Sequence, residues 1–235
     1  MLIQVQDVRF WMQDDTSSTR SCIVNLANLP MLPRLMLVTD RHAMRPDFLS
    51  AIRAALRGGA CLIQLREKDL PRAELETLAR EATKLCAEYC ATLLLNSHRD
   101  LANELNIGAH WPERFLRNIE YSMSEISFGV SVHSVQSAQR AQQLGARYVV
   151  FGSVFPTTSH PNETPAGIEK LREIVANVSI PVYAIGGIDS VDSIRACLET
   201  GAHGVAVRSA VWNARDVKQK VEELLETIGD YHRIV

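Results

Sequence analysis

Eight short apolar runs recur along the chain from Pro33 onward, and this repeat constrains the fold more than any other feature. The runs are rich in Val, Ile and Leu and have few polar interruptions, which is typical of parallel strands buried on both faces. They cover residues 35–39, 61–65, 92–96, 107–111, 126–132, 148–154, 182–186 and 204–207. The sequence therefore predicts eight buried strands.

The stretches between these runs have the period of an α-helix. Residues 75–89, 135–144 and 217–228 each carry one apolar stripe, whereas residues 100–105 and 113–118 form weaker patterns. Strands that alternate with helices predict parallel βαβ units, and eight units predict closure into a barrel. The alternative is an open doubly wound sheet, but the glycine-rich turn usual after its first strand is missing at Val38-Thr39-Asp40. We predict an α/β fold with a single (β/α)8 TIM barrel over residues 31–235.

Composition excludes several classes of function. A chain of 235 residues is long enough for one large domain, and its net charge of −2 does not indicate a nucleic-acid partner or an anionic membrane. No apolar run reaches the roughly 18 residues of a membrane helix. The five cysteines are scattered and odd in number, which does not suggest a disulfide framework. We interpret the chain as a reduced, cytoplasmic protein.

Residues 1–30 differ from the rest because they show no period. The apolar stretch after Arg20 is broken by Asn25 and Asn28, so a signal peptide fits poorly. We predict that residues 1–30 are an N-terminal extension, partly disordered.

Polar residues end all eight predicted strands, although the strand interiors are apolar. Barrel enzymes build their active sites at the C-terminal ends of their strands, so this contrast predicts a site there. These residues are Thr39, Asp40, Gln64, Arg66, Lys68, Asn96, Ser97, His110, Ser131, His133, Gly152, Ser153, Thr157, Thr158, Ser159, His160, Gly186, Gly187, Arg208 and Ser209.

Gly186 and Gly187 follow the seventh strand and predict a phosphate site. Glycine lets the backbone approach a ligand closely, and the loops after strands seven and eight are the usual phosphate site of this fold. Ser209 would cap the last helix or offer its N–H, and Arg208 would add charge or point outward at the rim. The alternative is a plain strand-to-helix turn.

Gln64, Arg66 and Lys68 alternate along an extended segment, so their side chains share one face. Two cations and an amide suit a phosphate or pyrophosphate. The alternative is an ion pair with Glu67 or Asp69 at the rim.

His133 follows Ser131 at the end of the fifth strand and is the best candidate for proton transfer. His110 and His160 are weaker candidates, and the other histidines are interpreted as structural or surface residues. No HxH, HExxH or CxxC spacing predicts a zinc site.

Six motifs follow one another along the chain: Val38-Thr39-Asp40, Gln64-Leu65-Arg66-Glu67-Lys68, Asn96, Gly129-Val130-Ser131-Val132-His133-Ser134, Phe151-Gly152-Ser153-Val154-Phe155-Pro156-Thr157 and Ala184-Ile185-Gly186-Gly187-Ile188. With these motifs in this order, the chain closely resembles the thiamine phosphate synthase/TenI family from about Leu35 to Leu225. The resemblance implies one of two activities. The synthase joins a pyrimidine pyrophosphate to a thiazole phosphate using magnesium, and TenI-type proteins aromatise a thiazole carboxylate phosphate by moving a proton.

Departures from the family pattern favour the tautomerase. The two aspartates that the resemblance leads us to expect are replaced by Ser97 and Phe115, and the Thr-x-Thr-Lys loop lacks its lysine at His160. A hard divalent cation needs carboxylate oxygens, and here Glu113 or Asp100 would have to supply them. The resemblance also implies a catalytic histidine in the Ser-Val-His-Ser motif, which is His133 here.

The leading hypothesis is a cofactor-free, metal-independent thiazole tautomerase. His133 would carry the proton, and the substrate phosphate would lie on Gly186, Gly187, Arg208 and Ser209. Residues predicted to bind the rest of the thiazole phosphate are Gln64, Arg66, Lys68, Asn96, Ser131, Thr157, Ser159 and His160. Two alternatives stay open: a synthase, which would require Mg²⁺, and a non-catalytic binder of phosphate ligands. A homo-oligomer also stays open.

Overall fold

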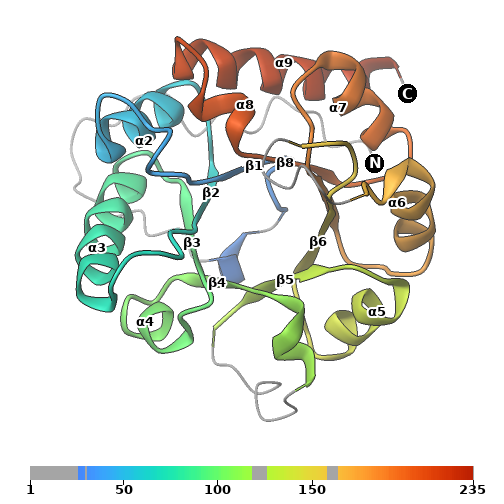
Figure 1. The fold of residues 1–235 in the computed structure, drawn as a ribbon, viewed down its shortest axis with the longest axis horizontal. Helices are drawn as coiled ribbons and strands as arrows, with labels where there is room; N and C mark the ends of the chain where they lie inside the picture. The colour runs from blue at the N-terminus through green and yellow to red at the C-terminus, as the bar shows by residue number, and fades with distance from the viewer. Residues whose placement is uncertain (1–25, 30, 118–125, 158–163, 235) are drawn as a thin grey trace.

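Eight parallel strands form a closed barrel in sequence order, as predicted (Figure 1). The computed structural model describes residues 26–29, 31–117, 126–157 and 164–234. Strand β8 closes the barrel on β1, with Leu35 opposite Val205 and Leu37 opposite Val207. The strands are β1 (Leu35–Val38), β2 (Leu62–Leu65), β3 (Thr92–Asn96), β4 (Gly108–Trp111), β5 (Phe128–Val132), β6 (Tyr148–Gly152), β7 (Val182–Ile185) and β8 (Gly204–Val207).

Helices surround the barrel on its outside (Figure 1). They are α2 (Phe48–Arg57), α3 (Arg72–Glu88), α4 (Arg99–Glu104), α5 (Val135–Gln143), α6 (Gly167–Ala176), α7 (Val191–Leu198), α8 (Ser209–Trp212) and α9 (Val217–Ile234). After β4, where the helical pattern is weak, the chain forms the 3-10 helix η2 (Glu113–Arg117). Among the described residues, no helix is both long and apolar enough to cross a bilayer.

The strands are apolar throughout because both of their faces are buried. In β1, Leu35 and Leu37 pack outward in the cluster shared with the helices, whereas Met36 and Val38 belong to a second cluster. That second cluster fills the barrel interior, as the alternation of side chains along a strand requires. Gly129 on β5 makes room in this interior, since a Cβ there would lie 2.0 Å from Cζ of Tyr148.

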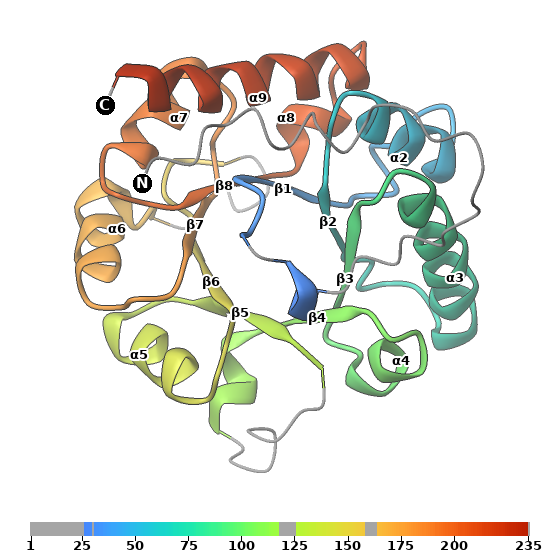
Figure 2. The same cartoon turned by 180° about the vertical axis from the view of Figure 1, so that it is seen from behind.

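The segment before β1 closes the N-terminal end of the barrel (Figure 2). The 3-10 helix η1 (Leu26–Asn28) places Leu26 in the interior cluster with no exposed surface. Arg147 donates to the carbonyl of Leu29 at 3.0 Å, and Arg34 donates to the carbonyl of His203 at 2.6 Å. The last residues of the predicted extension therefore help to close the N-terminal end of the barrel. Residues 1–25 lie outside the described part.

We expect Leu26→Ala to lower the free energy of unfolding by about 2–5 kcal/mol, because it removes buried methyl groups and leaves a cavity. Met31→Ala is the matched control, since Met31 is 74% exposed and a surface substitution changes stability by about 0.5 kcal/mol or less. Urea unfolding of the full chain measures both variants. Equal free energies of unfolding for the two variants would show that the segment before β1 does not stabilise the N-terminal end of the barrel.

Candidate functional site

A cavity of about 870 Å³ opens at the C-terminal ends of the strands. The residues predicted for catalysis, substrate binding and phosphate binding line it wherever they are described, whereas the strand-end residues Thr39 and Asp40 do not: the lining includes Gln64, Arg66, Lys68, Asn96, Ser131, His133, Thr157, Gly186, Gly187, Arg208 and Ser209. Ser159 and His160 lie outside the described residues. Strand closure thus gathers residues that are up to 145 positions apart, from Gln64 to Ser209.

The floor of the cavity is divided into a polar half and an apolar half. Its polar half consists of inward-facing residues near the ends of β2 to β5, namely Gln64, Asn96, His110 and Ser131. Its apolar half comes from β1 and β6 to β8, with Met36, Val38, Val150, Ile185 and Ala206. A flat heterocycle fits such a floor, because its faces need apolar contacts and its ring nitrogens need hydrogen bonds.

His110 is fully enclosed and connects the barrel interior to the floor. Its Nδ1 lies 3.0 Å from the Tyr148 hydroxyl, and its Nε2 lies 2.8 Å from Oγ of Ser131. We assign the ring proton to Nε2, because the buried Tyr148 hydroxyl then donates to Nδ1. Burial, with a further effect from Arg66, lowers the pKa of His110 to about 3. His110 therefore holds Ser131 in place as a neutral ring, a role that the sequence alone did not assign.

Four cations line the same cavity: Arg66, Lys68, Arg114 and Arg208. The charge of Arg66 contributes most to lowering the pKa of Lys68, followed by burial and then by Arg114 and Arg208. Burial lowers the pKa of Arg66, and Arg208 lowers it further. The guanidinium groups stay protonated in any case, so the cavity holds a concentration of positive charge.

Glu67 and Asp69 form no ion pair within 4.0 Å with Arg66 or Lys68 among the described residues, so the rim ion pair considered from the sequence is not present, although Glu67 acts on Arg66 at longer range and partly offsets the lowering of its pKa by burial. Glu67 accepts hydrogen bonds from the Thr39 hydroxyl at 2.5 Å and from the backbone N–H of Arg41 at 3.2 Å. Asp69 pairs with Arg41 and with His42. In the part of the chain that the structure describes, Arg66 and Lys68 have no ion-pair partner within 4.0 Å.

Gly186 and Gly187 have φ angles of +102° and +67°, which disfavour any other residue. A Cβ on Gly186 would lie 2.7 Å from Cα of Ser153, and one on Gly187 would lie 2.4 Å from the carbonyl oxygen of Pro156. Packing against the loop after β6 thus already requires both glycines. Their backbone still lines the cavity beside Arg208, whose Nε lies 3.9 Å from a carboxylate oxygen of Asp40. Arg208 therefore contributes to the lining of the cavity.

His133 lies at the rim, where its side chain is 66% exposed. Its Nε2 is 3.9 Å from Oε2 of Glu113, a buried oxygen with no hydrogen-bond partner among the described residues. Glu113 was considered from the sequence only as a substitute magnesium ligand, and Arg114 was missed, because the sequence pattern gives no orientation to a short loop after β4. Both line the cavity.

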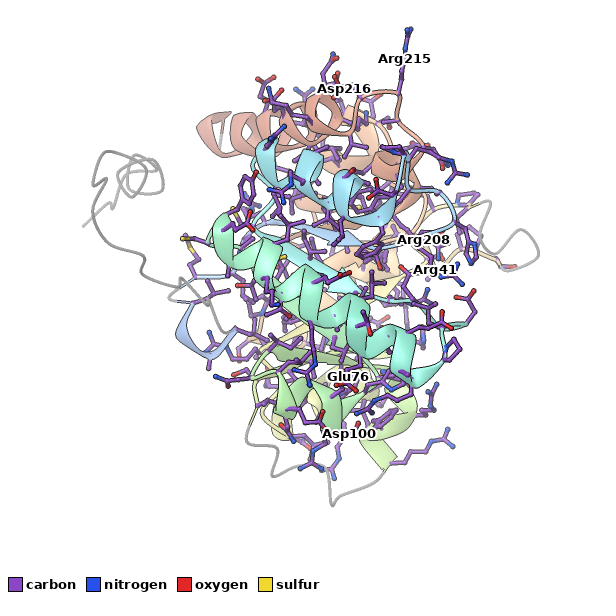
Figure 3. All side chains as sticks on the ribbon, turned by 90° about the vertical axis from the view of Figure 1, so that its left-hand side faces the viewer. Arg41, Glu76, Asp100, Arg208, Arg215 and Asp216 are labelled. Carbon is purple, nitrogen blue, oxygen red and sulfur yellow. The ribbon has the colours of Figure 1, made fainter. Side chains whose placement is uncertain are left out.

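The carboxylates of the cavity fit a magnesium ion poorly. Ser97 and Phe115 take the places of the two expected aspartates, and Phe115 stacks on Trp111 with ring centroids 6.2 Å apart. Asp100, which is labelled in Figure 3, does not replace them. It lies on α4, pairs with Arg72 at 2.5 Å and does not line the cavity. Among the described residues, no group of three or more His, Cys, Asp or Glu side chains could hold a metal ion. Glu113 is thus the one expected substitute that faces the cavity.

The closed barrel, with a cation-lined cavity at the C-terminal ends of its strands, has the architecture of the (β/α)8 barrel enzymes. A family model described as thiamine monophosphate synthase matches residues 35–211. The chain belongs to this family of thiamine-biosynthesis enzymes. A thiamine-phosphate synthase of Desulfitobacterium hafniense is 42% identical over 190 residues, which cover 77% of this chain and 90% of that protein.

Two archaeal proteins are similar over a larger share of the chain. A thiamine-phosphate synthase of Pyrococcus abyssi is 39% identical over 200 residues, covering 84% of this chain and 95% of that protein. The solved structure of thiamine phosphate pyrophosphorylase from Pyrococcus furiosus is 36% identical, with a TM-score of 0.74, and covers 84% of this chain and 96% of that chain.

We predict that His110 stays neutral from pH 8 to pH 5 in a histidine-detected NMR titration, because its pKa is lowered to about 3. The unfolded chain, with a histidine pKa of about 6.5, binds a proton in this range that the folded chain does not bind. The contribution of His110 to stability is therefore present above pH 6.5 and is lost as the pH falls towards 3. Protonation of His110 near pH 6 would contradict the enclosed hydrogen-bonded ring.

Proposed function

We propose that this chain is a thiamine-phosphate synthase, a transferase that joins a hydroxymethylpyrimidine pyrophosphate to a thiazole phosphate. The observation that carries the proposal is the cluster of Arg66, Lys68, Arg114 and Arg208 around one cavity. Two phosphorylated substrates bring several negative charges into this space, and clustered cations suit them. The names of the relatives support this alternative more than the tautomerase that the sequence motifs favoured.

The two anionic groups would bind on different parts of the mouth. The thiazole phosphate would lie on the backbone of Gly186, Gly187 and Ser209 with Arg208 beside it. The pyrophosphate would contact Gln64, Arg66 and Lys68, which come from the β2 end of the barrel. Asn96, Ser131 and Thr157 line the space between these groups and would bind the rings and the linking atoms. Ser159 and His160 are proposed to complete the binding site.

The reaction is a displacement at the methylene carbon of the pyrimidine. The carbon–oxygen bond to pyrophosphate breaks, and pyrophosphate leaves with the electron pair. The thiazole ring nitrogen donates its lone pair to the methylene carbon and forms the new carbon–nitrogen bond. Arg66 and Lys68 would stabilise the charge that develops on the leaving oxygen, and the floor would hold the rings in line.

We expect the purified chain, supplied with both substrates and magnesium, to form thiamine phosphate, detected by mass. Arg66→Ala should lower kcat/KM by about 10²–10³-fold, because it removes one charge that stabilises the leaving group. Arg80→Ala is the matched control, since Arg80 pairs with Glu76 on the outside of α3. No product from a folded chain would contradict the proposal.

A thiazole tautomerase is the second candidate, favoured by the 3.9 Å pair of His133 and Glu113 at the rim. This reaction needs a phosphate anchor and a proton carrier, and needs no metal. His133→Ala would lower tautomerase turnover by about 10²–10⁴-fold, measured with the thiazole carboxylate phosphate. Under the synthase proposal the same variant keeps the coupling rate within about tenfold of the parent, because His133 carries no essential proton there. A chain that binds the phosphates but performs neither reaction would be a non-catalytic binder.

A further inference from the structure

We propose that the mouth of this barrel binds a pyrophosphate group without a divalent cation, and that Arg114 is one of the side chains that replace the metal. The inference rests on the proposed function for its substrate, but the binding itself can be tested with inorganic pyrophosphate alone. Four observations carry it. Most carboxylates near the mouth are engaged by other groups, and Arg114 lies beside the position of an expected aspartate. An aromatic ring packs against Arg114, and further cations line the same cavity.

Most carboxylates near the mouth are already engaged by other groups. Asp40 lies 3.9 Å from Arg208, Glu67 accepts from Thr39 and Arg41, and Asp69 pairs with Arg41 and His42. Glu113 has one oxygen without a hydrogen-bond partner among the described residues, but it faces His133. Because Mg²⁺ is held by one or two carboxylates together with substrate phosphates, Glu113 is the rival explanation that the experiment must test.

Arg114 lies on η2, beside the position where the family pattern led us to expect an aspartate. Its guanidinium carbon is 5.3 Å from the centroid of the Phe115 ring, and Phe115 stacks on Trp111. An arginine held over an aromatic face is oriented while its N–H donors stay available. Phe115, which stands in place of the expected aspartate, thus supports the cation Arg114. A positive charge therefore lies where the family pattern led us to expect a negative one.

Arg114 belongs to the same electrostatic cluster as the other three cations. It lines the cavity with them and is one of the charges that lower the pKa of Lys68. Cations gathered in one cavity repel one another, and they would also repel an incoming Mg²⁺ ion. A pyrophosphate relieves this repulsion, because its oxygens accept hydrogen bonds from several cations at once.

The same arrangement accounts for the departure of the leaving group without a metal. When the carbon–oxygen bond of the pyrimidine pyrophosphate breaks, the electron pair moves to the pyrophosphate oxygen. Arg66, Lys68 and Arg114 already carry the positive charge that this oxygen requires, so it needs neither a proton nor a metal, while the lone pair of the thiazole nitrogen forms the new bond to the methylene carbon.

The test is the binding of inorganic pyrophosphate to the full chain by calorimetry, with EDTA and with MgCl₂ at matched ionic strength. We expect binding in EDTA, and equal or weaker binding with Mg²⁺, which complexes free pyrophosphate. Arg114→Ala should weaken binding in EDTA by about tenfold or more. Arg117→Ala is the control: it removes an exposed cation at the end of the same 3-10 helix, outside the cavity.

Three results would overturn the inference: binding only with Mg²⁺, no binding in either condition, or equal effects of Arg114→Ala and Arg117→Ala. Loss of Mg²⁺-dependent binding in Glu113→Gln would assign the site to a metal instead. Circular dichroism of each variant checks that it is folded. Coupling activity is measured separately with and without EDTA. Metal-free pyrophosphate binding with no coupling in either condition would reject the synthase and keep this inference. Binding and coupling that both require Mg²⁺ would keep the synthase and reject this inference.

Discussion

The pairing of β8 with β1 is the constraint on which the rest of the structure depends. It places Leu35 opposite Val205, and it brings Arg208 at the end of the last strand to within 3.9 Å of Asp40 at the end of the first. In an open sheet these two edges would be far apart, and Arg208 would not share a cavity with Arg66. Closure thus creates the cation cluster as well as the apolar interior, and function and stability rest on the same backbone hydrogen bonds.

Hydrogen bonds between the ends of β1 and β2 support this cluster. The Thr39 hydroxyl accepts from the backbone N–H of Arg66 at 2.9 Å and donates to Glu67. Burial raises the pKa of Glu67, and the hydrogen bonds that Glu67 accepts from Thr39 and from the backbone of Arg41 oppose that shift. Through Thr39, the Glu67 carboxylate therefore fixes the backbone at the end of β2. The side chain of Arg66 takes no part in these bonds and stays available to a ligand. A preorganised charge of this kind needs little rearrangement when an anion binds.

Most of the architecture could be predicted from the sequence, because both faces of each strand are buried and the apolar runs are therefore continuous. The interior of the barrel also explains features that periodicity could not reveal, such as Gly129, which makes room for Tyr148. Positions at strand ends were predictable because alternation fixes where a side chain points. The place of Arg114, the contact of Glu113 with His133 and the contact of His110 with Ser131 were not, since they depend on loop conformation and on which strands become neighbours.

The loop after β4 is where the two candidate reactions diverge. Glu113 and Arg114 are adjacent in sequence, yet the first lies 3.9 Å from His133 and the second lies over Phe115. A proton transfer needs an acid or base such as His133 to reach the substrate, whereas pyrophosphate departure needs positive charge at the leaving oxygen. The tautomerase would therefore depend on the His133 side of this loop, and the synthase on the Arg114 side. The cation cluster combines residues that follow β2 and β8 with Arg114 on η2, whereas His133 stands at the exposed rim. The charge that lines the cavity therefore agrees better with the departure of pyrophosphate than with a proton transfer.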